Sequence, residues 1–280
     1  MQHSELVSVI MGVRYLRDDL SPLRRAIDSI LQQSYSNLEL LICENDSTDE
    51  AKSVLARYAQ VDSRVHLIDG SGAFLLGEKL NRCIAAAKGK WIARQDDDDQ
   101  SLPERLEKQL SFLQKHTQYA FVGCNVKVEQ DTIIVGIRHF PSVPKIKDFL
   151  FVQPFIHPTL VFHRNCLKAV GGYSTSPYCH GCEDYDLLLR LYQAGYCGAN
   201  LLQPYFIYHV PFSGSHTRSF SMRVNEVITR WKRFYSLGLL PGAVPYVVKP
   251  ILVGLIPQRL LRKLKILHHA TAIKKEDLNE

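Results

Sequence analysis

Short apolar runs alternate with longer amphipathic stretches over the first 116 residues. The runs are strand-length and rich in β-branched residues, which is typical of buried strands; they cover residues 6–13, 38–43, 65–68 and 91–93. The stretches between them carry apolar side chains at helical spacing, which predicts helices over residues 21–31, 48–58, 77–87 and 103–116. This alternation predicts an α/β fold, a Rossmann-like sheet with helices on both faces.

The second half of the chain has a less regular pattern. Its apolar runs predict strands over residues 120–128, 132–137, 159–162 and 205–210, the first two of them paired, and its helical spacing predicts helices over residues 184–193 and 221–237. Because this half is mixed, we expect it to pack against residues 1–116 and to complete one site. Residues 1–217 then form one domain, of which 117–217 is the second half, and residues 218–280 form a helical C-terminal extension.

Two polar clusters follow predicted strands directly. Glu44 and Asn45 follow the second strand, and the acidic run Asp96–Asp99 follows the fourth. Ligands of such sheets bind outside the carboxyl ends of the strands. Glu44 and Asn45 supply acceptors that could read the edge of a nucleobase, whereas Ser47 or Thr48 is explained as the cap of the next helix.

Four consecutive carboxylates repel one another unless a cation is present. Mg²⁺ and Mn²⁺ prefer oxygen ligands, commonly one or two carboxylates together with phosphate oxygens and water. Asp96 and Asp98 point the same way if strand geometry continues through them. The alternative is a solvated acidic turn in which Asp99 caps the following helix.

A third cluster, Glu183-Asp184-Tyr185-Asp186, opens a predicted helix. Carboxylates at a helix N-terminus are common for dipole reasons alone. A carboxylate in a cleft can instead act as a general base toward a hydroxyl group.

Charge and cysteine content add two constraints. The net charge is +6, yet residues 218–265 contain ten Lys or Arg and one acidic residue, so the basic character belongs to the C-terminal part. That charge fits either an anionic lipid surface or a solvated basic face, and no nucleic-acid motif accompanies it. The odd number of cysteines, seven, and their apolar surroundings predict buried free thiols. The polar N-terminus lacks a signal-peptide pattern, which makes the cytoplasm the expected location.

The ordered set of motifs resembles family 2 glycosyltransferases of the GT-A fold over about residues 6–217. It comprises Val7-Ser8-Val9-Ile10-Met11, the stretch 26–35, Asn45–Asp49, Leu80-Asn81-Arg82, the stretch 89–109, His157-Pro158-Thr159, Gly171-Gly172-Tyr173 and Glu183–Leu187. No single motif is decisive, but the order is specific.

The resemblance implies an inverting transfer of a sugar from a nucleotide-sugar to a hydroxyl of a glycan or lipid-linked acceptor, in polysaccharide or glycolipid biosynthesis. By this likeness Asp96 contacts the nucleotide, Asp98 holds Mn²⁺ or Mg²⁺ together with Asp96, and Asp184, beside Glu183, is the catalytic base. Gly12, Arg14, Glu44 and Asn45 fall at nucleotide-binding positions. Residues 1–116 are then the nucleotide-sugar half and residues 117–217 the acceptor half.

The chain departs from the family pattern at several positions. Arg14 and Tyr15 stand where an aromatic residue and Asn are usual, Asn45 where Asp is frequent, and Asp46 where Gly is common. These departures leave the nucleotide open. Arg230-Trp231 resembles the end of a motif of processive synthases, but the preceding Gln is absent, so single-sugar transfer is expected.

Several alternatives stay open at this point. His209 and His216 lie where such folds place a late ligand for metal or diphosphate, although each is more often an ordinary histidine. A sugar nucleotidyltransferase would have a Gly-rich basic loop after the first strand, and the stretch after Met11 is poor in Gly. An inactive sugar-nucleotide-binding or scaffold protein is disfavoured because the key carboxylates are intact.

The C-terminal extension suggests a membrane contact. Residues 241–257 are apolar but are interrupted by prolines, a lysine and a glycine, so they do not read as a spanning helix. From Gln258 onward, leucines fall on one side of a predicted helix and Arg259, Arg262, Lys263 and Lys265 on the others. Such a helix can lie in an anionic membrane interface, pack on the protein, or form a subunit contact.

Overall fold

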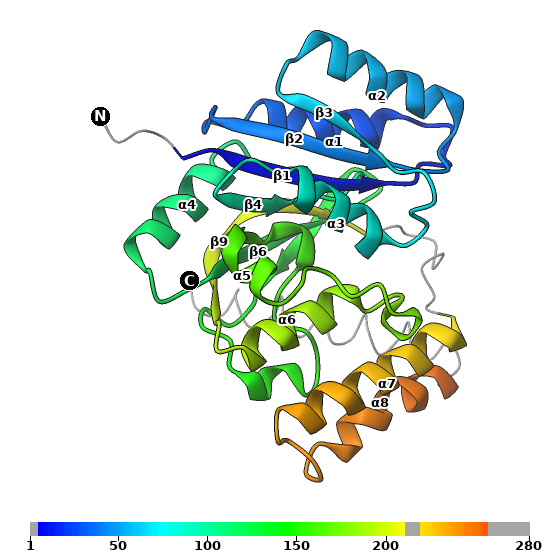
Figure 1. Ribbon diagram of the computed structural model, residues 1–280, viewed down its shortest axis with the longest axis vertical. Helices are drawn as coiled ribbons and strands as arrows, with labels where there is room; N and C mark the ends of the chain where they lie inside the picture. The colour runs from blue at the N-terminus through cyan, green and yellow to red at the C-terminus, as the bar shows by residue number, and fades with distance from the viewer. Residues whose placement is uncertain (1–4, 211–218, 257–280) are drawn as a thin grey trace.

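The structure is a computed structural model that describes residues 5–210 and 219–256. Within these residues one mixed sheet has the strand order β3-β2-β1-β4-β8-β6-β9-β5, and β7 pairs with β6 at its side. Figure 1 shows the sheet running through the upper and middle parts of the molecule, with two C-terminal helices at the lower end.

The first half is the predicted parallel sheet. Its strands β1, β2, β3 and β4 pair in parallel; they span Val7–Val13, Leu38–Glu44, Val65–Asp69 and Trp91–Arg94. The helices between and after them are α1, α2, α3 and α4; they span Ser21–Leu31, Asp49–Val61, Leu76–Ala86 and Arg105–Lys115. All four predicted strands and helices are confirmed to within a few residues.

Successive side chains of each strand pack on opposite faces of this sheet. Val9 and Met11 of β1 pack with α1, α2 and α4 in one hydrophobic cluster. Ile10, which lies between them, packs on the opposite face in a cluster that includes α3 and α6. Because successive side chains of a strand point to opposite faces, uniformly apolar strands require helices on both sides, as Figure 1 shows.

The second half extends the same sheet. β8 (Val161–His163) lies antiparallel between β4 and β6 (Phe121–Gln130) and so joins the two halves. β7 (Ile133–Arg138) forms the predicted hairpin with β6. β9 (Gly198–His209) runs parallel to β6 and begins well before the predicted 205–210, and β5 (Gln100–Ser101) pairs with it.

The remaining elements are helical. α5 and α6 span Arg164–Ala169 and Glu183–Gln193, and short 3₁₀ turns span Ile146–Phe149, His157–Thr159 and Pro177–Cys179. All seven cysteines are free and six are buried, as predicted. Cys182 Sγ lies 3.3 Å from the Thr229 hydroxyl.

Two helices, α7 (Phe220–Ser236) and α8 (Val244–Leu255), follow the sheet. Phe234 of α7 and Val247 of α8 belong to the same core cluster as α6, so both helices share the core of the preceding domain. The predicted boundary at residue 217, His216 and the helix predicted from Gln258 lie outside the described residues. Among the residues that are described, no helix has the length and apolar character needed to cross a membrane.

The pair Ser21-Pro22 predicts Ser21 as the N-cap of the first helix and Pro22 as its first residue, and this prediction is wrong by one residue. Leu20 is the N-cap of α1, and Ser21 is its first residue. Ser21 donates its backbone N–H and its hydroxyl to the carboxylate of Asp19. Asp19 thus accepts from one of the backbone N–H groups at the helix start that lack a partner within the helix.

Candidate active site at the carboxyl ends of the strands

The carboxyl ends of three neighbouring strands lie level with one another. Val13, Glu44 and Asp69, the last residues of β1, β2 and β3, are paired in register. The fourth strand ends at Arg94, which is paired with Ile10. Parallel strands therefore deliver the polar residues that follow them to one edge of the sheet, where nucleotide ligands of such folds bind.

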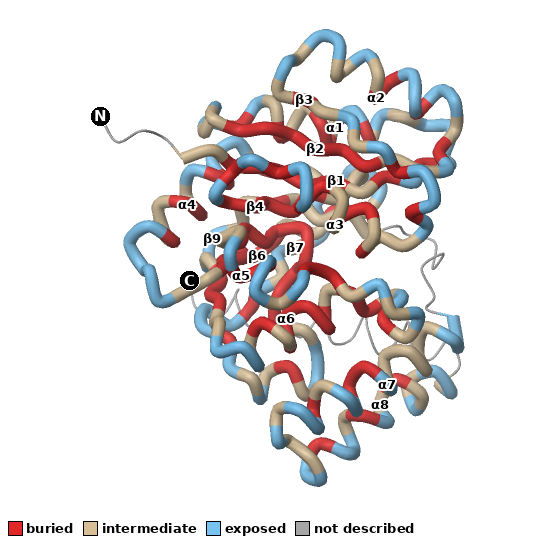
Figure 2. Tube along the Cα trace, viewed as in Figure 1, coloured by how far each residue is buried: buried red, intermediate tan, exposed pale blue. Residues whose placement is uncertain are grey.

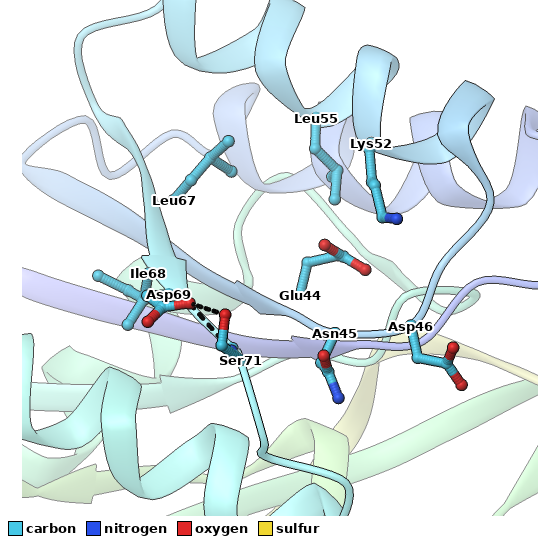
Figure 3. Close-up of a pocket in the computed structure, with 10 residues that line it drawn as sticks. Glu44, Asn45, Asp46, Lys52, Leu55, Leu67, Ile68, Asp69 and Ser71 are labelled. Carbon is cyan, nitrogen blue, oxygen red and sulfur yellow. Dashed lines mark hydrogen bonds between the residues drawn. The ribbon is translucent and has the colours of Figure 1, made fainter.

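A pocket of about 560 Å³ lies at this edge, beyond β2 and β3. Figure 3 shows that Glu44 and Asn45 point in opposite directions there: Glu44 towards α2 and Asn45 away from it. Glu44 Oε1 accepts the backbone N–H of Ser47 at 2.8 Å. Asn45 donates its amide to the carbonyl of Ala73 at 3.2 Å. Both predicted nucleotide-binding residues line the pocket, and each also holds its own turn in place.

Two departures from the family pattern face each other. Asp46 has φ +64°, a left-handed conformation that Gly adopts readily and Asp tolerates. Arg14 donates from Nε and Nη2 to Asp46 Oδ2, at 2.9 and 2.7 Å, although both side chains are more than half exposed. Tyr15, by contrast, is buried, with 2% of its surface exposed, and its ring is not available to stack on a base.

Close packing explains Gly12, another predicted nucleotide-binding residue. A Cβ at this position would lie 2.9 Å from Leu76 Cδ1 and 3.2 Å from Lys79 Cβ, so Gly lets α3 approach β1. Lys79 is buried, and its ammonium donates to the carbonyls of Val13 and Asn45 at 2.6 and 3.2 Å. Burial lowers the pKa of Lys79. This lysine ties together the ends of β1 and β2.

The acidic run leaves strand geometry immediately. β4 ends at Arg94, so the premise that strand alternation sets the directions of Asp96 and Asp98 is wrong. Each carboxylate is instead held by an arginine: Asp96 by the fully buried Arg94, and Asp98 by Arg17 at 2.9 Å. Both carboxylates therefore lie in a loop after β4, and each is oriented by its own arginine.

Asp97 and Asp99 show how much negative charge this loop concentrates. Burial, followed by the charges of Asp98 and Asp96, raises the pKa of Asp97 to about 7. Asp99 is 1% exposed and accepts the backbone N–H of His209 at 2.7 Å. The alternative role of Asp99 as a helix cap is wrong, because Glu104 precedes α4 and Asp99 instead ties the loop to β9.

This donor set fits a divalent cation that also binds phosphate. Asp96 and Asp98 are partly exposed and supply two carboxylates, and Mg²⁺ or Mn²⁺ bound to a diphosphate needs no more from the protein. The pKa of Asp97 is raised first by burial and then by the neighbouring charges of Asp98 and Asp96, and a cation would relieve the second of these effects. Across the described ranges, no group of three or more His, Cys, Asp or Glu side chains stands in a metal-binding arrangement of its own.

The acidic cluster at the start of α6 divides into three environments. Asp184 is partly exposed, and its Oδ2 accepts the side-chain amide of Gln153 at 2.9 Å. Glu183 is buried, and burial raises its pKa. Asp186 is fully buried between Arg190 and Arg233, at 2.7 and 2.6 Å. Asp186 is therefore a structural anchor, and Asp184 is the member of the cluster with access to a ligand.

The acidic loop and the start of α6 act electrostatically on the same side chains. The charges of Asp96 and Asp184 both act to raise the pKa of Tyr173, after the larger effect of its burial. The same two carboxylates, together with Asp99, act on Tyr208 in the same direction. Carboxylates from both halves of the chain thus lie within electrostatic range of the same two tyrosines.

Comparison with known proteins identifies the family of this chain. A sequence model described as "Glycosyl transferase family 2" matches residues 13–167. The protein named "Putative glycosyltransferase EpsE" from Bacillus subtilis (strain 168) is 33% identical over 264 residues, which cover 94% of each chain. The chain belongs to glycosyl transferase family 2. The O-antigen biosynthesis glycosyltransferase WbnJ from Escherichia coli is 38% identical over 198 residues, 67% of this chain and 72% of that one.

Solved structures of low sequence identity share the fold of this glycosyltransferase. The mannosyltransferase PcManGT from Pyrobaculum calidifontis, in complex with GDP-Man and Mn²⁺, superposes with a TM-score of 0.57 at 18% identity, over 97% of this chain and 81% of that one. S. aureus TarS in complex with UDP-GlcNAc gives 0.64 at 15% identity, over 87% and 72%. These likenesses confirm the expected GT-A fold.

Other residues of the glycosyltransferase were not singled out from the sequence. Arg17 and Gln153 contact Asp98 and Asp184, yet both lie in irregular segments that carry no motif. Arg230, noted for its likeness to a synthase motif, is buried and pairs with Glu226 within α7. His209 lies 3.3 Å from Glu129, which accounts for its side chain without a ligand.

Proposed function

We propose that this glycosyltransferase moves one sugar from a nucleoside-diphosphate sugar to a hydroxyl of a glycan or lipid-linked acceptor, with inversion at the anomeric carbon. The observation that carries the proposal is the match to glycosyl transferase family 2, together with the partly exposed carboxylates Asp96 and Asp184 that the two halves of the chain supply. One carboxylate then serves the donor, and the other serves the acceptor.

Asp184 is the proposed base. Its carboxylate takes the proton of the acceptor hydroxyl as the hydroxyl oxygen forms a bond to C1 of the sugar. The bond from C1 to the diphosphate oxygen breaks on the opposite side, and the nucleoside diphosphate leaves with the electron pair. Gln153 donates to Asp184 Oδ2, and the backbone N–H of Tyr185 donates to Oδ1 at 2.8 Å. These two bonds fix the carboxylate in position, and each oxygen keeps a further lone pair for the acceptor hydroxyl.

Asp96 and Asp98 are the proposed holders of Mn²⁺ or Mg²⁺, with Asp96 also contacting the nucleotide. The cation would offset the charge that grows on the departing diphosphate. Arg17 pairs with Asp98 and Arg94 with Asp96, and these ion pairs orient the two carboxylates. Gly12, Arg14, Glu44 and Asn45 are the proposed nucleotide contacts, since the last two line the pocket beyond β2.

The proposed biological setting is the assembly of a surface polysaccharide, at the cytoplasmic face of a membrane. The support comes from similar proteins. Some relatives in sequence are named for O-antigen and amylovoran biosynthesis, and proteins of the same fold have been solved in complex with UDP-GlcNAc or GDP-Man. The described helices are too short to span a bilayer, so any membrane contact within the described part is peripheral.

A donor screen tests the proposal. The full-length protein is incubated with UDP- and GDP-sugars in Mn²⁺, and released nucleoside diphosphate is measured. We expect hydrolysis of one donor class, abolished by EDTA and by Asp98→Ala, because the loss of one metal ligand removes several kcal/mol of transition-state stabilisation. Glu104→Ala serves as the control for a lost carboxylate outside the acidic loop, because Glu104 is exposed and pairs with Lys108 at the surface. Full activity in EDTA, or near-normal turnover of Asp98→Ala, would refute metal-dependent transfer.

A further inference from the structure

The outward face of α8 is wholly aliphatic. Val244, Val248, Leu252 and Leu255 recur every three or four residues, and they are 38, 40, 56 and 71% exposed. Side chains at this spacing form one row along a helix, here about 16 Å long at 1.5 Å per residue. The opposite face of the helix, which includes Val247, is buried in the core.

The neighbouring helix α7 adds an aromatic row. Trp231 and Tyr235 lie one turn apart and are 51 and 73% exposed. α7 and α8 pack on each other at the lower end of the molecule in Figure 1, and Figure 2 shows exposed positions along both helices there. We call the two aromatic residues of α7 and the four aliphatic residues of α8 together the α7–α8 surface; it comprises Trp231, Tyr235, Val244, Val248, Leu252 and Leu255. Exposed apolar surface of this extent marks an interaction site.

The α7–α8 surface is joined to the proposed catalytic base. Lys249 of α8 donates to the carbonyl of Phe151 and lies over its ring, and Phe151 is 62% exposed. Two residues further along the chain, Gln153 donates to Asp184. A molecule held on the α7–α8 surface would therefore lie beside the segment that positions the base.

Charge and side-chain type favour a lipid surface as the occupant. Residues 219–256 contain five basic residues and one acidic residue, and two of the five, Arg230 and Arg233, are paired with Glu226 and Asp186. Residues 257–267 add four basic and no acidic residues. Trp and Tyr prefer the interface between headgroups and acyl chains. Basic residues near an anionic leaflet add attraction that an uncharged protein partner would not use.

We propose that the α7–α8 surface docks on an anionic lipid bilayer and presents the active site to an acceptor held in that bilayer. The inference rests on the proposed transfer to a lipid-linked acceptor. It assigns the contact to folded helices that share the catalytic core, so the contact does not depend on the segment after Gln258 alone.

Trp231 provides a direct probe. The chain has two tryptophans; Trp91 is 5% exposed and donates to Glu5, whereas Trp231 is half exposed. Full-length protein is titrated with phosphatidylglycerol vesicles and with neutral phosphatidylcholine vesicles. We expect the emission to shift to shorter wavelength, and to be quenched by brominated acyl chains, with the anionic vesicles. Trp231→Phe should abolish both changes. Absence of both changes in the wild type, or their persistence in Trp231→Phe, would overturn the proposal, and equal binding to both vesicle types would overturn its anionic preference.

A charge placed on the surface separates this contact from the tail. Leu252→Glu should weaken vesicle binding at least about tenfold, since it removes an aliphatic group that docking would bury in the bilayer and adds a negative charge that the anionic lipids repel. Val61→Glu is the matched control, because Val61 is 72% exposed at the end of α2, remote from α8 in Figure 1. Unchanged binding of Leu252→Glu would assign the contact to another segment and overturn the proposal.

Two further readouts complete the test. Leu252→Glu should keep the donor hydrolysis of the wild type, since the substitution lies outside the proposed catalytic machinery. A wild type that binds vesicles yet hydrolyses no donor would refute the proposed function and leave the surface standing. Sedimentation equilibrium without lipid should give the same mass for wild type and variant; a dimer that Leu252→Glu dissociates would assign the surface to a second copy of the chain and overturn the lipid proposal.

Discussion

Arg105 offers a prediction whose size follows from its contacts. This residue of α4 is fully buried. Its guanidinium donates to Gln109 Oε1 at 3.1 Å, Gln95 Oε1 at 3.2 Å and Ser101 Oγ at 2.7 Å. It also donates to two carbonyls, those of Arg94 and Pro158, at 2.9 and 3.0 Å. One side chain thus links α4, the end of β4, the acidic loop and the turn before β8. Arg105→Met keeps much of the aliphatic volume and removes every donor.

The expected loss follows from counting the acceptors. Five oxygens lose a donor, but Gln95 Oε1 and Ser101 Oγ keep their mutual hydrogen bond at 2.7 Å. Each of the remaining three costs about 1–3 kcal/mol when left unpaired in the interior. Relaxation around the site and the burial of an apolar side chain both reduce this cost, so we expect a loss of about 3–5 kcal/mol. For a domain of this size each kcal/mol lowers Tm by about 2–4 °C, which gives a decrease of roughly 6–20 °C.

Thermal and urea unfolding, followed by circular dichroism, measure this loss. Lys108→Met is the matched control on the same helix, because its ammonium pairs with Glu104 at the surface and surface pairs contribute little; we expect no measurable change. If Arg105→Met unfolds within about 2 °C of the wild type, the buried hydrogen bonds do not stabilise the fold and the reasoning fails. Because Gln95 and Arg94 flank the acidic loop, we also expect weaker donor hydrolysis from the folded fraction.

Two further predictions concern the site and its pH dependence. Asp184→Asn should lower turnover roughly 10²–10⁴-fold with little change in donor binding, since it preserves shape and removes the proton acceptor; Glu183→Gln, at a buried position, should be milder, and the reverse order would show that the base is misassigned. Burial lowers the pKa of His157 to about 3, and its Nε2 lies 2.7 Å from the Tyr173 hydroxyl. A pKa depressed in the folded state contributes stability that is present above the unfolded value of about 6.5 and is lost as pH falls towards 3. His157→Gln should therefore reduce the fall in urea midpoint between pH 7 and 4, and an unchanged pH dependence would contradict the assignment.

The fold was largely predictable because its signals are local. Uniformly apolar strands such as β1 and β2 can only be satisfied by helices on both faces, and the intervening segments show helical spacing. β9 was predicted too short because its first half, from Gly198, is interrupted by polar residues and Pro204, and its strand character comes from pairing with β6. Pairing between distant segments is not written in the local pattern of either one.

The candidate site was predictable only where a motif marks it. Asp96, Asp98 and Asp184 stand in recognisable clusters, whereas their partners Arg17 and Gln153 do not. A long side chain in an irregular segment acquires its role from the tertiary fold, which brings it across a sequence distance of 81 residues for Arg17 and Asp98. The predicted directions of the Asp96 and Asp98 side chains were wrong for the same reason, since these side chains are oriented by arginines and not by strand alternation.

The pair Arg14 and Asp46 shows how departures from a family pattern can be related. Taken singly, Arg14 replaces an aromatic residue and Asp46 replaces a glycine, and neither change explains the other. In the structure Asp46 adopts the left-handed conformation that glycine favours, and its carboxylate receives two hydrogen bonds from Arg14. The positive charge of Arg14 thereby offsets the carboxylate that Asp46 adds beside the nucleotide edge of the sheet, where a second anion would repel a diphosphate. The two departures are therefore best understood as one compensated change, so that Asp46→Gly alone would leave Arg14 free to meet the donor, and Arg14→Ala alone would leave an unbalanced carboxylate against it.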